Sequence, residues 1–88
     1  MRTVFNPSFL RDPRKIEPVS VLEQVRAAIL DVEAAPDSRA IPNLKKLSGS
    51  GSYYRIRVGD HRIGVRINSD TVSFFRDLHR REIYRYIP

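Results

Sequence analysis

The chain has 88 residues, of which 41% are hydrophobic and 30% are charged, and it contains no cysteine. This length and composition predict one globular domain over residues 1–88 and exclude a two-domain, disordered or fibrous protein. The absence of cysteine excludes disulfides, thiolate metal sites and cysteine nucleophiles, and it fits a reducing compartment. The longest apolar run, residues 27–30, is too short to span a membrane, and residues 1–7 contain no apolar leader stretch. We therefore expect a cytoplasmic protein.

The net charge of +6 lies in the second half of the chain. Residues 1–44 carry six basic and six acidic side chains, whereas residues 45–88 carry ten basic and four acidic ones. A neutral half joined to a basic half is typical of a protein that binds a polyanion, either nucleic acid or an acidic protein segment. A surface that is charged only for solubility is the alternative that charge by itself leaves open.

The N-terminal part of the chain predicts a strand followed by two helices. Residues 2–5 are β-prone, and Asn6-Pro7 is typical of a helix N-cap followed by proline at the first helical position. Pro13 limits this first helix to about two turns.

The second helix is expected over residues 20–35. Ser20 and Glu23 have the spacing of a capping box, and Pro36 pushes the residue before it out of helical geometry. Apolar residues recur at helical intervals and form one stripe, which consists of Val21, Leu22, Val25, Ala28, Ile29 and Val32. The stripe predicts a helix that faces the core and has no chemical role.

A loop over residues 36–52 follows, and we expect Leu44 and Leu47 to reach the core from it. From Tyr53 the apolar pattern changes to a period of two, which is typical of strands. Gly59-Asp60 predicts a two-residue hairpin turn.

This pattern predicts strands over residues 53–58, 61–68 and about 71–78, followed by a basic and aromatic tail over residues 80–88. The order βααβββ predicts an α+β fold. Its sheet is small and antiparallel, mixed at one edge, with the two N-terminal helices packed on one face.

Counting outward from the turn gives the register of the hairpin. One side carries the pairs Val58 with His61, Ile56 with Ile63 and Tyr54 with Val65, and this side must face the core. The other side carries Arg57 opposite Arg62, Arg55 opposite Gly64 and Tyr53 opposite Arg66. Like charges directly opposite one another in a sheet cost up to about 1 kcal/mol. We therefore interpret this side as a surface for RNA or phosphate, because guanidinium groups bind phosphate oxygens and Tyr53 offers a stacking surface. A merely solvated arginine face is the alternative.

The third strand contains a conflict. Val72 and Phe74 fit its core side, but strict alternation would then bury Arg76. A bulge or an early strand end near Phe75 would resolve this conflict.

Three stretches together carry a resemblance to a known family. They are Leu47-x-Gly49, the run YRIRVGDHRI at residues 54–63, and His79-Arg80 followed by Ile83-Tyr84. Because of these stretches, the chain resembles the toxins of the RelE/ParE superfamily, which come from bacterial and archaeal toxin–antitoxin pairs. The resemblance covers essentially the whole chain.

The resemblance implies a function on RNA. RelE-like members cleave messenger RNA in the ribosomal A site, where the 2′-hydroxyl attacks the adjacent phosphate without a metal or another cofactor. Carried over by position, their working groups are Arg55, Arg57, Arg62, Arg80 and Tyr84. We expect catalytic roles for Arg57, Arg62, Arg80 and Tyr84. Binding of RNA or phosphate is expected from Arg55, Arg66, Lys45, Lys46, Tyr53 and Arg81.

The general base is a departure from the family pattern. The best-known member has lysines at the positions of Arg55 and Arg57, and an arginine keeps its proton at physiological pH. Histidine accepts a proton near neutrality. His61 falls on the core side of the hairpin, so His79, which adjoins Arg80, is the better candidate.

The superfamily also implies partners and an alternative function. A cognate RelB-like antitoxin would neutralise the toxin, the ribosome and messenger RNA would be its targets, and operator DNA would be bound only through the antitoxin complex. ParE-like members instead inhibit DNA gyrase without enzymatic activity and lack the nuclease residues. The nearly complete set of nuclease residues favours the RelE-like function.

Overall fold

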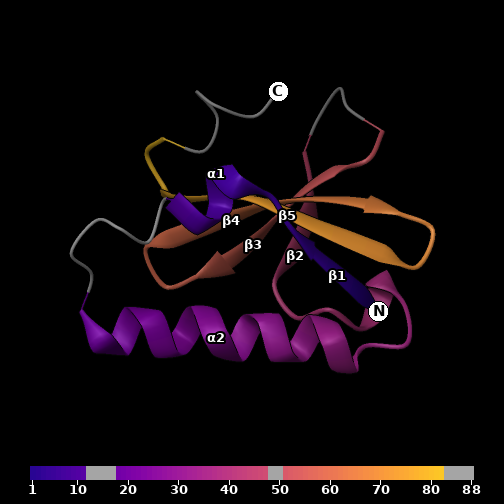
Figure 1. Ribbon diagram of the computed structural model, residues 1–88, viewed down its shortest axis with the longest axis horizontal. Helices are drawn as coiled ribbons and strands as arrows, with labels where there is room; N and C mark the ends of the chain where they lie inside the picture. The colour runs from indigo at the N-terminus through magenta and orange to yellow at the C-terminus, as the bar shows by residue number, and fades with distance from the viewer. Residues whose placement is uncertain (12–17, 48–50, 83–88) are drawn as a thin grey trace.

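A sheet and a long helix that runs beside it form the frame of the protein (Figure 1). The computed structural model describes residues 1–11, 18–47 and 51–82. Within these ranges the strands are β1 (Arg2–Phe5), β2 (Leu44–Lys46), β3 (Tyr53–Val58), β4 (His61–Asn68) and β5 (Thr71–His79). The helices there are α1 (Pro7–Arg11), α2 (Val19–Ala34) and the short 3-10 helix η2 (Ser38–Ala40). None of these helices is both long and apolar enough to cross a membrane.

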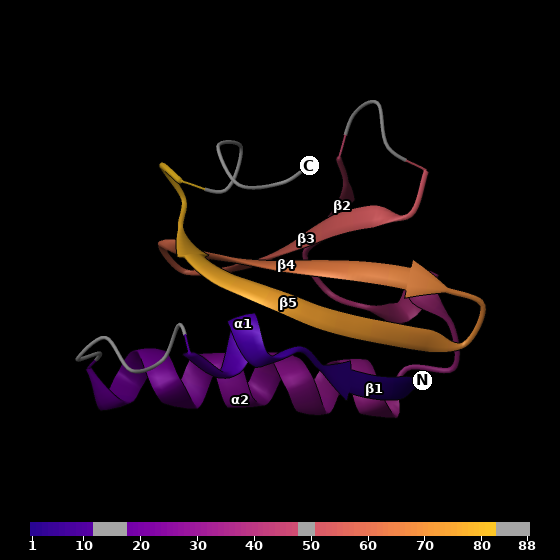
Figure 2. The same ribbon diagram turned by 45° about the horizontal axis from the view of Figure 1, so that its top comes forward.

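The strands join in one sheet in the order β1-β5-β4-β3-β2. The edge strand β1 runs parallel to β5, and the other neighbours are antiparallel. Figure 2 shows α1 and α2 together beneath the sheet. The prediction of an α+β fold with a sheet mixed at one edge is therefore confirmed.

The start of α2 differs from the prediction. Pro18 occupies the N-cap position with φ −57° and ψ 146°, and no side chain caps the helix. The carbonyl of Pro18 accepts the N–H groups of Val21 (3.0 Å) and Leu22 (3.2 Å). Because this carbonyl starts the helix, Ser20 lies inside the first turn, and the predicted capping box is wrong.

The free energy of unfolding of a Ser20 variant tests whether Ser20 caps α2. We expect Ser20→Ala to change the free energy of unfolding by less than about 0.5 kcal/mol, whereas loss of a true N-cap typically costs about 1 kcal/mol. Urea unfolding is the measurement. The matched control is Asp37→Ala, because the Asp37 carboxylate does accept the N–H of Arg39 at the start of η2 (2.9 Å). A larger loss for Ser20→Ala than for Asp37→Ala would contradict the observed helix start.

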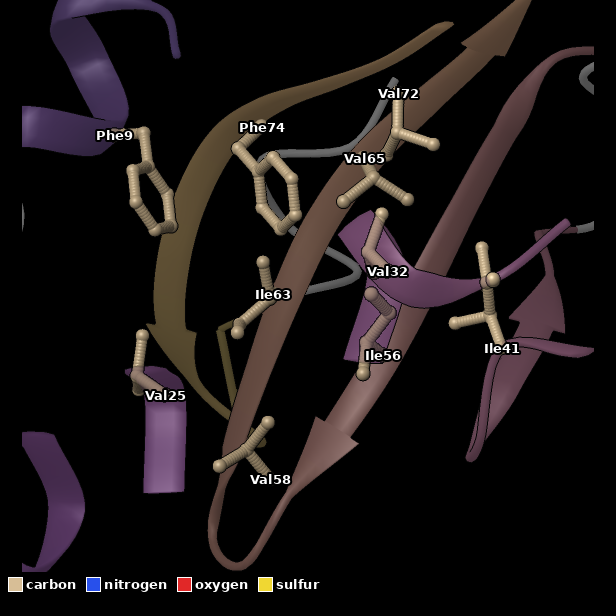
Figure 3. Close-up of a cluster of buried hydrophobic side chains, with 11 residues drawn as sticks. Phe9, Val25, Val32, Ile41, Ile56, Val58, Ile63, Val65, Val72 and Phe74 are labelled. Carbon is tan, nitrogen blue, oxygen red and sulfur yellow. The ribbon is translucent and has the colours of Figure 1, made fainter. Parts of the chain in front are cut away.

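The core lies between the helices and the sheet (Figure 3). Its buried side chains come from both helices, the loop after α2 and the strands, and include Phe9, Val25, Val32, Ile41, Ile56, Ile63, Val65, Val72 and Phe74. The ring of Phe74 is fully buried and stacks on Phe5, with 5.1 Å between the ring centres. The packed face of α2 is narrower than the predicted stripe, because Leu22 is 42% exposed.

The loop after α2 contains a strand that the sequence did not predict. Residues 44–46 form β2, which pairs antiparallel with residues 54–56 of β3. Leu44 packs against the core as expected. Leu47 is also buried, but it belongs to a second cluster with Leu78, against which Tyr53 and Phe75 pack. The expectation that both leucines reach one core is therefore only half correct.

The register of the β3–β4 hairpin matches the prediction at every pair from Tyr53 with Arg66 to Val58 with His61. The expected bulge is also present, because Val65 pairs with Phe74 but Gly64 pairs with Arg76. The extra residue, Phe75, reverses the alternation along the rest of β5. As a result Arg76 lies on the face away from the helices.

Candidate functional site

The face of the sheet opposite α1 and α2 (Figure 2), here called the open face, is strongly cationic. In β2 to β5, the register places on it Lys45, Tyr53, Arg55, Arg57, Arg62, Gly64, Arg66, Asn68, Thr71, Ser73, Arg76 and Leu78. Six of these twelve residues are basic and none is acidic. The open face therefore attracts anions through its own charge.

The basic residues of the open face lie in neighbouring rows that cross the strands. Arg57 and Arg62 are directly opposite one another near the hairpin turn. The next row runs from Lys45 through Arg55 and Gly64 to Arg76.

Arg57 and Arg62 differ in how they are held. Arg57 is exposed, and its guanidinium makes no hydrogen bond to the residues that the structure describes. Arg62 is half-buried, and its guanidinium donates to the carbonyls of Gly59 (2.9 Å) and His61 (3.0 Å). Arg62 is thus fixed at the turn, while Arg57 is available to a ligand.

Arg55 is positioned by the loop that leads into β2. Its guanidinium donates to the carbonyl of Asn43 (2.9 Å), which also accepts the N–H of Arg57 (3.2 Å). Asn43 has φ 62°, a left-handed conformation that asparagine tolerates better than most residues. This conformation brings one carbonyl to both arginines of β3.

Arg80 and Arg81 follow the end of β5 and are exposed. The N–H of Arg80 donates to the carbonyl of Asp60 (2.8 Å), which ties the end of β5 to the hairpin turn. The N–H of Arg81 donates to Nδ1 of His79 (3.3 Å). The backbone of Arg80 is therefore held at the same end of the sheet as Arg62.

The aromatic part of the open face is built around Tyr53. The guanidinium carbon of Arg66 lies 5.7 Å from the centre of the Tyr53 ring. Phe75 meets the same ring edge-on, with 5.5 Å between the ring centres. Arg66 is also held by a hydrogen bond from its Nε to Oγ of Ser52 (3.2 Å).

Two residues proposed for the site lie elsewhere. Lys46 pairs with Tyr54 and so belongs, by register, to the side of the sheet that faces the helices. His79 is directly opposite His61 on that same side, with 6.4 Å between the ring centres. Tyr84 and Gly49 lie outside the described residues.

His61 has a structural environment, as its place in the hairpin predicts. Its Nδ1 lies 3.1 Å from Oδ1 of Asp77, and the Asp77 side chain is 4% exposed. This partly buried pair links β4 to β5 on the helix side of the sheet, behind the cationic rows.

Arg76 is the basic residue of the open face, within β2 to β5, that sequence reasoning left out of the site. Its side of the sheet depends on the bulge at Phe75. The signal in the sequence was the conflict itself, since an arginine at a core position of a strand is strongly disfavoured.

Comparisons with known proteins identify the family. Residues 4–84 match the model of the ParE toxin of the type II toxin–antitoxin system parDE. The chain is also 37% identical to toxin RelE3 of Methanocaldococcus jannaschii over a 92-residue alignment that covers all of both proteins. The chain belongs to the RelE/ParE superfamily of toxins. The resemblance seen in the sequence is thereby confirmed.

Solved structures agree with this assignment. The toxin is similar to a chain of the RelB–RelE antitoxin–toxin complex from Methanococcus jannaschii, with a TM-score of 0.79, 34% identity and coverage of 97% of this chain and 99% of that one. It is also similar to a chain of the toxin–antitoxin complex RelBE2 from Mycobacterium tuberculosis, with a TM-score of 0.68, 25% identity and coverage of 89% and 88%. The matches carry both RelE and ParE names, so the reaction has to be argued from the site.

Proposed function

We propose that the toxin is a cytoplasmic endoribonuclease that cleaves messenger RNA on the ribosome. The observation that carries this proposal is the exposed Arg57 directly opposite Arg62, on a face without acidic residues in β2 to β5. A polyanion that approaches this pair meets the exposed guanidinium of Arg57 beside that of Arg62, which hydrogen bonds to the hairpin turn hold in place. The relative named RelE3 supports the same activity.

In the proposed reaction the 2′-oxygen attacks the adjacent phosphorus, and the bond from phosphorus to the 5′-oxygen breaks. One fragment then ends in a 2′,3′-cyclic phosphate and the other begins with a 5′-hydroxyl. Negative charge builds up on the phosphate oxygens in the transition state. Arg57, Arg62 and Arg80 would stabilise it, because cationic donors beside a developing negative charge lower its energy. Tyr84, which lies outside the described residues, is proposed to stack on or hydrogen-bond to the nucleotide.

Two arginines on β3 leave the proton of the 2′-hydroxyl without an evident acceptor, since an arginine remains protonated. His79 as general base stays a prediction. Its register places it on the helix side of the sheet, at the last residue of β5. The ring would therefore have to reach the RNA around the end of the strand.

The role of His79 can be tested by substitution. If His79 accepts the proton, His79→Gln should lower the single-turnover rate of cleavage while RNA affinity is kept. His61→Gln is the comparison variant, because it removes the other histidine at this end of the sheet. An unchanged rate in folded His79→Gln would remove His79 from the reaction.

We propose an antitoxin as the protein partner. Both solved complexes named above pair a similar chain with an antitoxin. An acidic and apolar antitoxin segment would complement the charge of the open face and prevent RNA from binding there. Contacts of the complex with operator DNA would come from the antitoxin.

The alternative is inhibition of DNA gyrase, which the match to the ParE toxin model favours. One pair of assays separates the two functions. Purified toxin is added to an in vitro translation reaction, in which cuts in the message are mapped, and to a gyrase supercoiling reaction. Cuts that require the ribosome and disappear when the cut nucleotide carries a 2′-deoxyribose would support the nuclease. Inhibited supercoiling with intact message would support the alternative and overturn our proposal.

A further inference from the structure

Arg76 reaches the open face through the bulge at Phe75 and completes a row of basic residues with Lys45 and Arg55. Arg55 and Arg76 are both half-buried, and they flank Gly64 on the strand between them. Glycine has no side chain, so nothing projects from β4 between the two arginines. The row therefore presents an arginine on either side of an open position on β4.

The donors of Arg55 are only partly used within the protein. One terminal nitrogen donates to the carbonyl of Asn43 (2.9 Å). Its Nε is buried and makes no hydrogen bond to the described residues. The second terminal nitrogen makes no hydrogen bond to the described residues, so Arg55 keeps donors for a ligand. Since the neighbouring groups of the row are cationic, that ligand would be an anion.

The spacing of the rows fits RNA. Arg55 and Arg57 are two residues apart on β3, which corresponds to roughly 6.6 Å along a strand. This is comparable to the distance between consecutive phosphates of an extended RNA strand. For an RNA strand that runs along β3, a phosphate at the row of Arg57 and Arg62 would place its neighbour at the row of Arg55 and Arg76.

We propose that Arg76, together with Arg55, binds the phosphate next to the scissile one and so positions the RNA for cleavage. This inference rests on the proposed nuclease function. Arg76 is a positioning residue in this scheme, because it contacts a phosphate that does not react. Its contribution is to keep the scissile linkage aligned between Arg57 and Arg62.

The test combines protein variants with RNA that carries a single uncharged linkage. Arg76→Gln and Arg76→Lys are compared with wild type on ribosome-bound message, with Arg26→Gln as the control, because Arg26 is exposed on α2. We expect kcat/KM to fall roughly 10- to 100-fold for Arg76→Gln, less for Arg76→Lys, and not for Arg26→Gln. Circular dichroism and urea unfolding verify that each variant is folded.

The position of the contact is tested with a methylphosphonate at one of the two linkages that flank the cut. In the wild type, one of these substitutions should reduce cleavage by a factor similar to that of Arg76→Gln. In Arg76→Gln the same substitution should have little further effect, because the contact is already lost. A methylphosphonate three linkages away should reduce cleavage in neither protein.

The outcomes are distinguishable. If the wild type cleaves and Arg76→Gln cleaves equally well, the role of Arg76 is overturned and the nuclease proposal stays intact. The same holds if the loss of cleavage from Arg76→Gln and the loss from the methylphosphonate multiply at both flanking linkages. If Arg76→Gln does not fold, Arg76→Lys takes its place in both experiments, with a smaller expected loss of kcat/KM, and an unchanged kcat/KM in that variant would overturn the role of Arg76. A wild type that cleaves no ribosome-bound message would overturn the proposed function and this inference with it.

Discussion

Replacing Arg57 by alanine should reduce cleavage of ribosome-bound message by about 10²- to 10³-fold, the loss expected when one donor to a transition-state charge is removed. The toxin should remain folded. The Arg57 side chain is exposed, and its guanidinium makes no hydrogen bond within the described part of the chain. Removing it also relieves the repulsion from Arg62 directly opposite. Thermal stability should therefore be unchanged or slightly higher.

The measurement is the single-turnover cleavage rate together with the melting temperature. Arg26→Ala removes one positive charge from an exposed position of α2 and controls for net charge. Arg62→Ala is a less clean variant, because it also removes the two hydrogen bonds to the hairpin turn. Unchanged cleavage in a folded Arg57→Ala variant would show that the open face is not the catalytic surface.

The largest effect on stability should come from Phe74→Ala. Deletion of a fully buried phenylalanine ring typically costs about 3–5 kcal/mol, which is a large share of the 5–15 kcal/mol that stabilises a small domain. Phe74 is 0% exposed, and its ring packs on those of Phe5 (5.1 Å) and Phe9 (5.5 Å). Its loss would loosen β1 and α1 from β5 at once.

Urea unfolding followed by circular dichroism measures this loss. Phe75→Ala is the matched control, since the neighbouring ring is half-buried on the open face. It should cost clearly less than Phe74→Ala. An equal loss for the two variants would contradict the placement of Phe75 as the extra residue of the bulge.

The hairpin and the arginines on it could be predicted from the sequence because local rules specify them. A Gly-Asp turn sets the pairing, and a slip of one residue would have buried Arg55 and Arg57 and exposed Ile56. The open face was therefore predictable as far as β3 and β4 extend. The fold does not decide between RNA cleavage and gyrase inhibition, because both groups of toxins share it.

Other features depend on contacts distant in sequence. β2 has only three residues, two of them lysines, and it becomes a strand only by pairing with β3. The faces of β5 beyond Phe74 depend on where the bulge lies against Gly64. His79 was placed beside Arg80 by its position in the chain, but the shifted register puts it opposite His61. Adjacent residues of a strand point to opposite sides, so closeness in sequence was misleading.

The pairing of β1 with β5 also affects how the toxin is made. Residues 2–5 are synthesised before residues 71–74, yet the two segments pair as neighbouring strands. Arg76 and Arg80 are made later still. A nascent chain therefore cannot close its sheet or complete its cationic rows until residues 71–80 have been synthesised, and contacts this distant in sequence form slowly. Under the proposed function, the ribosome that translates the toxin meets only an incomplete site until then, and the proposed antitoxin can bind the chain while its sheet closes.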